Sequence, residues 1–431
     1  MTHKSITDTG ALWPSEHNGR VLKAESGGNL RQIRSGFDRT PGIVVVGATA
    51  GERAERFTAA ATAAGFAKPQ VFSWAELLRS TERFETALAA HSPALLRVDA
   101  HDGSFDCWLA LAEAGAEALA ELGSEPIAVG QLEQLRAERG LIWRRDISLM
   151  HQQVYLGLNT LALRVVAAAS ASGAILLNDP EAIAVCGDKK RCHSVMRNLG
   201  LAVPDLLTVR EANIDSLLEA MKKAKCPRVF LKPRFGSAVG VIAVAVAAHG
   251  VTAWAGAELA NSGGRRAVYA SRQVRKFTDS ADVAALTESA LTAGAQVEMW
   301  IPKAGHEGTT VDLRLLTIAG EPQDVMLRQA NSPITNLRLG ARRGDAVAFL
   351  GRLKRGVWEA VCAQACSFAQ RFPHTLQFAF DVAIPLRLNR HYFLEASCFG
   401  DPLQRSMHDS ADPYATLVAA LPGWLTTRRP Q

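Results

Sequence analysis

The sequence predicts a mixed fold in which an N-terminal α/β domain is followed by an α+β domain. Three observations lead to this prediction. The apolar run at residues 42–47 precedes a glycine-containing turn and an alanine-rich segment, which is typical of the start of a parallel βα unit. Two apolar runs within residues 228–244 are joined by a short glycine-serine turn. Two further runs, at residues 376–385 and 391–397, are separated by a connection of hairpin length, so we expect antiparallel pairing.

The composition is that of a soluble globular protein. The 431 residues are 48% apolar and 21% charged, which allows two or three domains with their own cores. The net charge of +6 is not gathered into long Lys/Arg runs or interleaved with aromatic residues, so we expect small anionic ligands and no nucleic acid. Residues 1–19 have no apolar core of signal-peptide type, and the most apolar segment, 161–177, is interrupted by Arg164. We therefore expect a cytoplasmic protein without a membrane span.

The seven cysteines are scattered, as expected for reduced thiols in such a protein. Cys362 and Cys366 share one helix face, and Cys186, Cys192 and His193 lie close in sequence. Neither group has a second ligand pair at zinc spacing, so we assign these side chains to core packing.

The first half of the chain contains the elements of the α/β domain. Residues 1–40 are polar and aperiodic, which predicts a flexible N-terminal extension, and residues 41–178 are expected to form the domain itself. The turn at 47–52 lacks the glycine spacing of dinucleotide-binding and P-loop motifs, so we predict a structural turn there. A strand at 174–177 is followed by Asn-Asp-Pro at 178–180, which marks the domain boundary.

The second half, residues 179–425, has a different order of elements. Its helices are predicted at 188–200, 213–225, 282–293 and 356–372. Its strands are predicted within 228–244 and at 296–302, 312–320, 323–329, 376–385 and 391–397, with a long polar loop through Asn336. This order predicts an antiparallel sheet that carries helices on one face.

Lys232 is the first candidate for a functional side chain. It ends the apolar run Val-Phe-Leu and is followed by a turn that contains Gly236, Ser237 and Gly240. Such a turn leaves several backbone N–H groups facing outward, where they can bind an anion. The pattern indicates a phosphate site, although an edge-strand lysine beside an ordinary hairpin is the alternative.

The last two predicted strands each contain a carboxylate among apolar residues, Asp381 in one and Glu395 in the other. Carboxylates in such surroundings resist burial unless a cation or a proton compensates them. Oxygen ligands of this kind favour Mg²⁺ or Mn²⁺. Alternation along the strand places Ser397 on the same face as Glu395. The alternative is that each carboxylate simply faces solvent.

Together with other residues at ordered spacings, these features resemble the ATP-grasp superfamily. The segments at 312–320, 327–345 and 395–401 are most similar to the branch of glutathione synthetase and the ribosomal-protein S6 glutamate ligases, and especially to an uncharacterised bacterial ATP-grasp family. The resemblance covers residues 179–425 well and 41–178 weakly, and it implies a pre-ATP-grasp-like domain followed by a two-lobed ATP-grasp fold. The residues that carry it are Lys189, Lys232, Glu298-x-Trp300-Ile301, Asp312-x-Arg314, Arg328, Asn336 and the pair Asp381 and Glu395.

The resemblance implies a nucleotide subsite. Lys189 and Lys232 would hold the α- and β-phosphates of ATP, and the turn with Gly236, Ser237 and Gly240 would close over them. Lys190 is an alternative to Lys189, because a shift of one residue in the helix start changes which lysine points inward. Glu298 would accept a hydrogen bond from the adenine amino group, with the backbone of Trp300 and Ile301 at the other ring edge. The Trp300 side chain could equally be an ordinary core aromatic.

The resemblance also implies catalytic and metal-binding residues. Arg328, and less firmly Arg314 and Asp312, would line the junction of nucleotide and acceptor together with Asn336. Asp381, Glu395 and Ser397 would hold Mg²⁺ or Mn²⁺. The family usually has asparagine at the position of Ser397, and a serine hydroxyl is the weaker ligand. The charged residues Lys303, His306 and Glu307 lie in a hinge insertion and are either solvated or in contact with ribose or substrate.

The implied reaction is the ATP-dependent ligation of a carboxylate to an amine or a thiol through an acyl phosphate, with release of ADP and phosphate. The implied partners are a small-molecule or peptide carboxylate and an amine or thiol acceptor, and a homo-oligomer is compatible with the resemblance. Two alternatives stay open: a small-molecule kinase on the same fold, and an ATP-binding protein of weakened catalysis, which the serine at 397 suggests.

Overall fold

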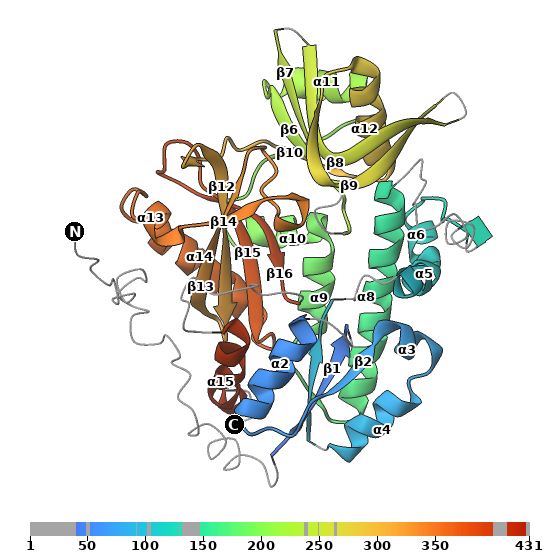
Figure 1. Cartoon of the computed structure of the whole chain (residues 1–431), viewed down its shortest axis with the longest axis vertical. Helices are drawn as coiled ribbons and strands as arrows, with labels where there is room; N and C mark the ends of the chain where they lie inside the picture. The colour runs from blue at the N-terminus through green and yellow to red at the C-terminus, as the bar shows by residue number, and fades with distance from the viewer. Residues whose placement is uncertain are drawn as a thin grey trace.

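The computed structural model describes most of the chain, and three sheets with their helices make up its architecture (Figure 1). The expected extension at residues 1–40, apart from Thr40, lies outside the described residues, as do Ser237 and part of the turn at 47–52. The described residues are 40–48, 52–91, 93–100, 105–128, 130–131, 147–236, 240–248, 250–262, 265–399 and 412–427.

The first sheet is parallel, as the sequence predicted for the N-terminal part. Its four strands lie in the order β2-β1-β3-β4, where β1 is Gly42–Gly47, β2 Gln70–Ser73, β3 Ala94–Val98 and β4 Ile175–Leu176. Every residue of β1 and β3 is buried, because helices cover both faces of the sheet. One face packs on α3 (Trp74–Arg79), α4 (Glu82–Ala90), α5 (Phe105–Ala114) and α8 (Ile147–Ala171), and the other on α2 (Glu52–Ala63) and α15 (Pro413–Thr426).

Helix α8 is the long apolar helix of this part of the molecule. By length and composition its segment Gln152–Ala171 could cross a membrane, but half of that segment is buried inside the structure. Gln153 is fully buried, and its amide donates to the carbonyls of Ala112 (2.8 Å) and Ile127 (3.2 Å). These bonds tie α8 to the residues around α5 and α6 (Ala116–Glu121). A buried side-chain amide needs partners of this kind.

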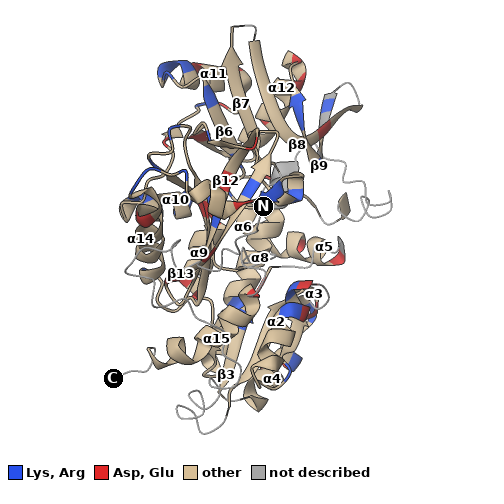
Figure 2. Ribbon diagram, turned by 60° about the vertical axis from the view of Figure 1, so that its left-hand side comes forward, with Lys and Arg blue, Asp and Glu red and all other residues tan. Residues whose placement is uncertain are grey.

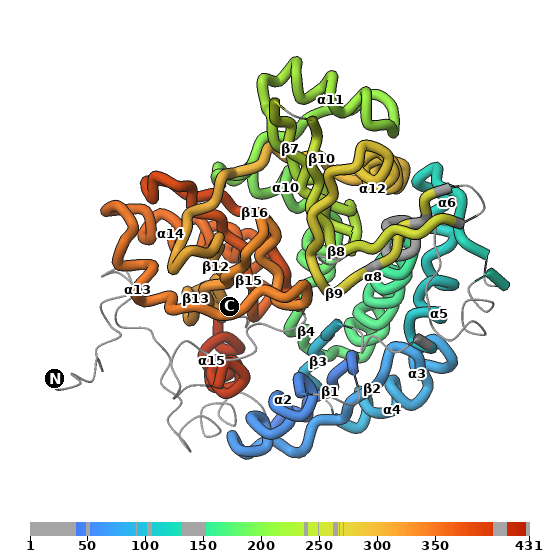
Figure 3. Tube along the Cα trace, turned by 45° about the horizontal axis from the view of Figure 1, so that its top comes forward, coloured from blue at the N-terminus to red at the C-terminus, as the bar shows by residue number. Residues whose placement is uncertain are grey.

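Helix α15 completes the core on one face of the first sheet, although it lies far along the chain (Figure 3). Its Tyr414 and Leu417 pack in one cluster with Val45 and Phe57 of the N-terminal part. The guanidinium of Arg97, on β3, lies over the ring of Phe57 at 4.8 Å and that of Tyr414 at 5.8 Å. Residues near both ends of the described chain therefore share one hydrophobic core.

The second sheet is antiparallel and has the order β5-β10-β6-β7-β8-β9. Helices α11 (Ile214–Lys223) and α12 (Ser280–Thr292) pack on one face, through residues such as Leu217, Met221 and Leu286. The strands are β5 (Leu206–Leu207), β6 (Arg228–Lys232), β7 (Ile242–Ala247), β8 (Gly250–Ser262), β9 (Arg265–Phe277) and β10 (Gln296–Met299).

The third sheet is also antiparallel, with the order β14-β13-β12-β15-β16 and β11 paired to β12. Helix α14 (Val357–Gln370) covers one face, where Phe368 meets Phe378 and Phe380 edge to face with centroids 5.4 Å apart. The strands are β11 (Gly305–His306), β12 (Thr309–Ile318), β13 (Glu321–Ala330), β14 (Arg342–Gly344), β15 (Gln377–Ala383) and β16 (Tyr392–Ser397). Two short helices, η2 (Leu337–Leu339) and α13 (Ala346–Leu350), lie between β13 and α14 along the chain, and α15 follows β16.

The order of elements alone predicted one antiparallel sheet in the second half, which is wrong; the structure has two, as the two-lobed fold implied by the resemblance requires. The sequence prediction did not find the hairpin β8–β9, which extends the second sheet. Alanine, glycine and basic residues fill those strands, so their apolar alternation is weak. The pairing of β15 with β16 is confirmed, and Asp381 lies directly opposite Glu395.

His391, next to β16, makes the stability of the fold depend on pH. Its Nε2 lies 3.0 Å from Gln364 Oε1, and burial lowers the pKa of His391 to about 4. In the unfolded chain the pKa is about 6.5, so the unfolded state binds more protons between these pH values. His391 therefore contributes stability that is present above pH 6.5 and is lost as the pH falls toward 4.

We expect acidification from pH 7 to pH 5 to cost the wild type about 2 kcal/mol of unfolding free energy through this group. His391→Gln keeps a polar partner for Gln364 but cannot titrate, so it should lose less stability over the same range. Urea unfolding at the two pH values measures the difference. Equal losses for both proteins would show that His391 is not the titrating group.

Candidate active site

A cleft between the second and third sheets gathers most of the residues that the sequence singled out. It encloses about 680 Å³ of space open to solvent. The predicted residues that line it are Lys189, Lys232, Glu298, Ile301, Asp312, Arg328, Asn336, Asp381 and Glu395. The predicted residues Arg314, Trp300, Gly236, Gly240 and Ser397 are described but do not belong to its lining. Apolar side chains complete the walls: Phe230, Val241, Met299, Ile334 and Leu394.

Lys189 enters the cleft from the first residue of α10 (Lys189–Asn198), and α9 (Pro180–Gly187) precedes it. Its side chain is buried and its Nζ lies 3.4 Å from Glu395 Oε1, whereas Lys190 is exposed. Of the two lysines, Lys189 is the one whose side chain lines the cleft. Asp188 caps the helix by accepting from the N–H of Lys190 at 3.0 Å, which sets the helix start and hence the direction of Lys189.

Lys232 lies at the end of β6 and pairs with Glu298 of the neighbouring strand β10. The distance from Lys232 Nζ to Glu298 Oε2 is 2.7 Å, and Nζ also lies 3.4 Å from the carbonyl oxygen of Leu394. Glu298 is 2% exposed, and its other oxygen accepts from the amide of Gln296 at 2.8 Å. The lysine thus reaches from the second sheet to the third, and the buried carboxylate holds it there.

The two glycines of the turn after β6, Gly236 and Gly240, are among the described residues. Gly236 and Gly240 have φ values of 112° and 87°, in the region that favours glycine. The ammonium of Lys189 donates to the carbonyl of Gly236, so the turn begins directly above that lysine.

Trp300 belongs to the wall behind the cleft. Its ring lies 5.1 Å from Phe230 and 5.8 Å from Trp254, and its backbone N–H donates to the carbonyl of Arg228 at 3.0 Å. Ile301, the next residue along the chain, lines the cleft. The tryptophan therefore acts as a core aromatic that supports the apolar wall.

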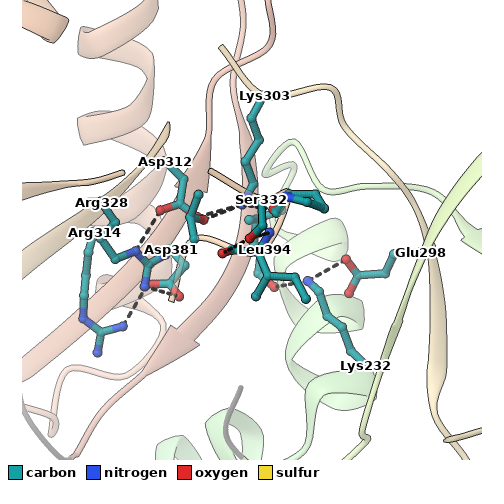
Figure 4. A network of polar contacts seen from close by, with 12 residues as sticks. Lys232, Glu298, Lys303, Asp312, Arg314, Arg328, Ser332, Asp381 and Leu394 are labelled. Atoms are coloured by element: carbon teal, nitrogen blue, oxygen red, sulfur yellow. Dashed lines mark hydrogen bonds and ion pairs between the residues drawn. The ribbon is translucent and has the colours of Figure 1, made fainter. Parts of the chain in front are cut away.

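The third sheet contributes a chain of ion pairs centred on Arg328 (Figure 4). Arg328 Nε donates to Asp312 Oδ1 at 2.7 Å, and Nη1 donates to Asp381 Oδ2 at 3.0 Å. Arg314 donates to the other oxygen of Asp381 at 2.8 Å. Three neighbouring strands position these groups, because Asp312 and Arg314 lie on β12, Arg328 on β13 and Asp381 on β15.

The chain of ion pairs fixes the protonation states of its members. Burial alone would raise the pKa of Asp381, but the guanidinium groups of Arg328 and Arg314 lower it to about 2. Burial would likewise lower the pKa of Arg328, but Asp312 and Asp381 raise it above its ordinary value. The cleft therefore presents a permanent buried cation and an ionised carboxylate side by side.

Lys303 and Thr335 extend this network; the sequence left Lys303 open between a solvated residue and a ribose or substrate contact, and it did not assign Thr335. Lys303 Nζ lies 2.9 Å from Asp312 Oδ2 and 2.6 Å from Thr335 Oγ1, and the Thr335 hydroxyl donates to the same Asp312 oxygen. Burial lowers the pKa of Lys303, and Asp312 partly offsets this effect. A buried lysine after a hinge strand could be suspected from sequence, but its partners depend on the contact between β12 and a distant loop.

Asn336 lines the cleft, but its side-chain oxygen already accepts a hydrogen bond from a backbone N–H group. Asn336 Oδ1 accepts from the N–H of Arg338 at 2.9 Å and so caps η2. Its role as a substrate contact stays a prediction. Of the hinge residues, Glu307 Oε2 accepts from Gln329 Nε2 at 3.3 Å, and His306 Nδ1 lies 3.0 Å from Arg352 Nη1.

The carboxylates of Asp381 and Glu395 fit a divalent cation bound together with a polyphosphate. Both line the cleft from directly opposed positions. Among the described residues no three His, Cys, Asp or Glu side chains gather at a metal-binding distance. Mg²⁺ commonly takes one or two protein carboxylates and completes its shell with phosphate oxygens and water, which suits this pair. The Ser397 hydroxyl donates to the carbonyl of Phe399 at 3.0 Å, and its role as a metal ligand stays a prediction.

The other charged residues in the described part of the chain include both basic and acidic side chains. Figure 2 shows basic residues scattered among acidic ones along the ribbon. The described cysteines are all reduced and buried, in agreement with their assignment to core packing. The cleft gathers several buried charged residues from two sheets, and a separate buried pair, Arg97 and Asp99, lies at the first sheet.

Comparisons with known proteins give similarities to solved structures. No protein-family model matches the chain, and no curated protein matches its sequence. The chain is similar to the ATP-grasp ligase PsnB in complex with a phosphomimetic variant of its minimal precursor, Mg and ADP, at 15% identity and a TM-score of 0.47, over 89% of this chain and 99% of that one.

Two other solved structures are similar to a comparable extent. The macrocyclase MdnC from Microcystis aeruginosa MRC, bound with precursor peptide MdnA, has 12% identity and a TM-score of 0.46, over 88% of this chain and 98% of that one. The D-alanine–D-alanine ligase from Bacillus anthracis, complexed with ATP, has 11% identity and a TM-score of 0.43, over 90% and 98%. The chain is similar to each of these enzymes along most of its length.

Proposed function

We propose that this chain is an ADP-forming ATP-grasp ligase that joins a carboxylate to an amine or a thiol through an acyl phosphate. The observation that carries the proposal is the distribution of charge in one cleft. Lys189 and Lys232 lie beside the carboxylates Asp381 and Glu395, and the buried cation Arg328 stands next to them. Two lysines suit a polyphosphate, and the apolar walls suit a flat base.

In the proposed reaction, a carboxylate oxygen of the substrate attacks the γ-phosphorus of ATP, and the bond to the β–γ bridging oxygen breaks to release ADP. The amine or thiol then attacks the carbonyl carbon, and phosphate leaves with the bonding electron pair while the nucleophile loses its proton to water or phosphate. Lys189 and Lys232 would hold the phosphates of the nucleotide. Arg328 would neutralise the charge on the phosphoryl group in transfer.

Asp381 and Glu395 are the residues that would hold Mg²⁺ or Mn²⁺. When bound, such an ion neutralises phosphate charge and so reduces the repulsion between ATP and an anionic carboxylate. The two arginines that already contact Asp381 orient its oxygens, and Lys189 does the same for Glu395.

The described thiols support a mechanism without a covalent enzyme intermediate. Burial raises the pKa of Cys366 to about 11, and it raises the pKa of Cys362 further. The pKa of Cys192 is also raised, mainly by its hydrogen bond with Cys186 and in addition by burial. A thiol must ionise to act as a nucleophile. Buried thiols with raised pKa values are therefore poor candidates, and positioning of two substrates is the better explanation of the site.

The decisive experiment is a screen for ADP release with paired carboxylates and amines or thiols, read by mass spectrometry of the product. We expect ADP formation that requires both substrates and a ligated product. A phosphorylated product formed without an amine or thiol would indicate a small-molecule kinase. Tight binding of ATP without ADP release under any pairing would indicate a nucleotide-binding protein without ligase activity.

Glu395→Gln tests the proposed role of the carboxylate pair. The change keeps the shape but removes one charge, so we expect the fold to persist and turnover to fall by about 10²-fold or more. In the wild type, Mg-ATP should raise the Tm more than ATP with a chelator, and this extra rise should disappear in Glu395→Gln.

The matched control is Glu359→Gln, an exposed carboxylate in the first turn of α14 away from the cleft. It should keep both the turnover and the magnesium-dependent rise in Tm. Wild-type turnover in Glu395→Gln would remove the carboxylate pair from the mechanism.

A further inference from the structure

Asp188 receives an unusual number of donors for a residue at a helix start. Arg234 Nε donates to its Oδ1 and Oδ2, both at 3.1 Å, and Arg234 Nη2 donates to Oδ2 at 2.7 Å. The same carboxylate accepts from the backbone N–H groups of Lys190 and Arg191 at the start of α10. An arginine–carboxylate ion pair of this kind is both strong and directional, because two guanidinium nitrogens donate to one carboxylate.

This ion pair joins two parts of the molecule that come from different sheets. Arg234 lies two residues after the end of β6, in the second sheet, whereas α10 packs against α9 and against β16 of the third sheet. A backbone bond runs parallel to the ion pair, from the N–H of Lys189 to the carbonyl of Arg234 at 2.9 Å. Asp188 and Arg234 therefore tie the end of β6 to the start of α10.

Each of these two elements carries one of the lysines assigned to the phosphates. Lys232 is the last residue of β6 and Lys189 is the first of α10, so each lysine lies within two residues of one partner of the ion pair. Neither Asp188 nor Arg234 lines the cleft, and the Arg234 side chain is 30% exposed on the outside. The pair is thus placed to set the separation of the two lysines without touching a nucleotide.

We propose that Asp188 and Arg234 are positioning residues that hold Lys189 and Lys232 at the spacing a nucleoside triphosphate requires. The proposal rests on the proposed function, because it takes the cleft to be an ATP site. Holding the two elements in place before ATP arrives removes part of the ordering cost of binding. The interaction is the same in the ground state and the transition state, so its loss should affect binding of ATP more than the chemical step.

Arg234→Gln is expected to raise the KM for Mg-ATP about 10-fold while kcat stays within about threefold of the wild type. Asp188→Asn should have the same effect, because asparagine still caps the helix but no longer carries the charge that Arg234 needs. Arg234→Lys keeps the charge and loses the fork, so it should restore part of the affinity. Calorimetric titration with Mg-ATP measures affinity independently of turnover.

The matched control is Arg197→Gln, near the far end of the same helix. Arg197 forms an exposed ion pair with Asp205 at 3.0 Å, which makes no contact with the turn after β6. This variant should keep the wild-type KM and Tm. The control shows whether losing any arginine ion pair of α10 raises the KM, or only losing the pair that joins the end of β6 to the start of α10.

The double variant Asp188→Asn with Arg234→Gln decides whether the two residues act as one unit. We expect its KM to be no higher than that of either single variant, because the first change already removes the interaction. Effects that multiply in the double variant, or unchanged ATP affinity in both single variants, would overturn the proposal. Wild-type protein that does not bind Mg-ATP would instead overturn the proposed function and the positioning role with it.

Discussion

Replacing Arg328 by glutamine is expected to lower the rate of ADP formation by about 10³-fold. Arg328 is the buried cation of the cleft, and it bonds to Asp312 and Asp381 at the same time. Its loss removes the charge that would stabilise the phosphoryl group in transfer, and it leaves the buried Asp312 and the partly buried Asp381 without their common partner. The second effect should also cost stability, on the order of 3–5 kcal/mol.

A second variant separates the two effects. Arg328→Lys keeps the positive charge but cannot bond to both carboxylates through separate fixed N–H groups, so it should fold nearly as stably as the wild type and still lose most of the turnover. Arg342→Gln, an exposed arginine on β14, is the control and should keep the wild-type rate. Steady-state kinetics and urea unfolding are measured on all three. A folded Arg328→Lys protein with the wild-type rate would exclude a catalytic role for the guanidinium.

Lys232→Ala is expected to weaken ATP binding by about 2–4 kcal/mol, which is the cost of losing one desolvated contact to a phosphate. It should also destabilise the fold, because Glu298 is buried and its ion pair with Lys232 is lost. Calorimetry gives the first quantity and urea unfolding the second. Wild-type ATP affinity in the folded variant would contradict the assignment of Lys232 to the phosphates.

The stability loss can be reversed without restoring the site. In the double variant Lys232→Met with Glu298→Gln no buried charge is left over, so we expect most of the unfolding free energy to return while ATP binding stays weak. A double variant that regains ATP affinity together with stability would show that Lys232 supports the fold and does not bind the nucleotide.

The local elements of the site could be predicted from the sequence. The short connection between β15 and β16 required them to pair, and pairing placed Asp381 opposite Glu395. The start of α10 follows from the capping residue Asp188, and its end from Gly200, which has a φ of 78°. These signals lie within a few residues of the feature they determine, so a single sequence is enough to read them.

The polar partners could not be predicted in the same way. Lys303 meets Thr335 across 32 residues, where a loop after β13 approaches β12. Lys232 reaches Leu394 across 162 residues, because the cleft brings the second and third sheets together. The hairpin β8–β9 was missed because its strands lack a clear apolar alternation. Such contacts depend on how distant elements pack, and the periodicity of either segment alone contains no information about the other.

The position of α15 has a consequence for the biosynthesis of the protein. One face of the first sheet is covered by α2 together with α15, whose residues 413–426 are translated more than 300 residues after β1. A domain that normally folds as it leaves the ribosome would here keep Ile43, Val45 and Leu95 partly uncovered until α15 emerges. During that interval the nascent chain exposes an apolar surface beside a β-sheet, the kind of surface that favours aggregation of a folding intermediate.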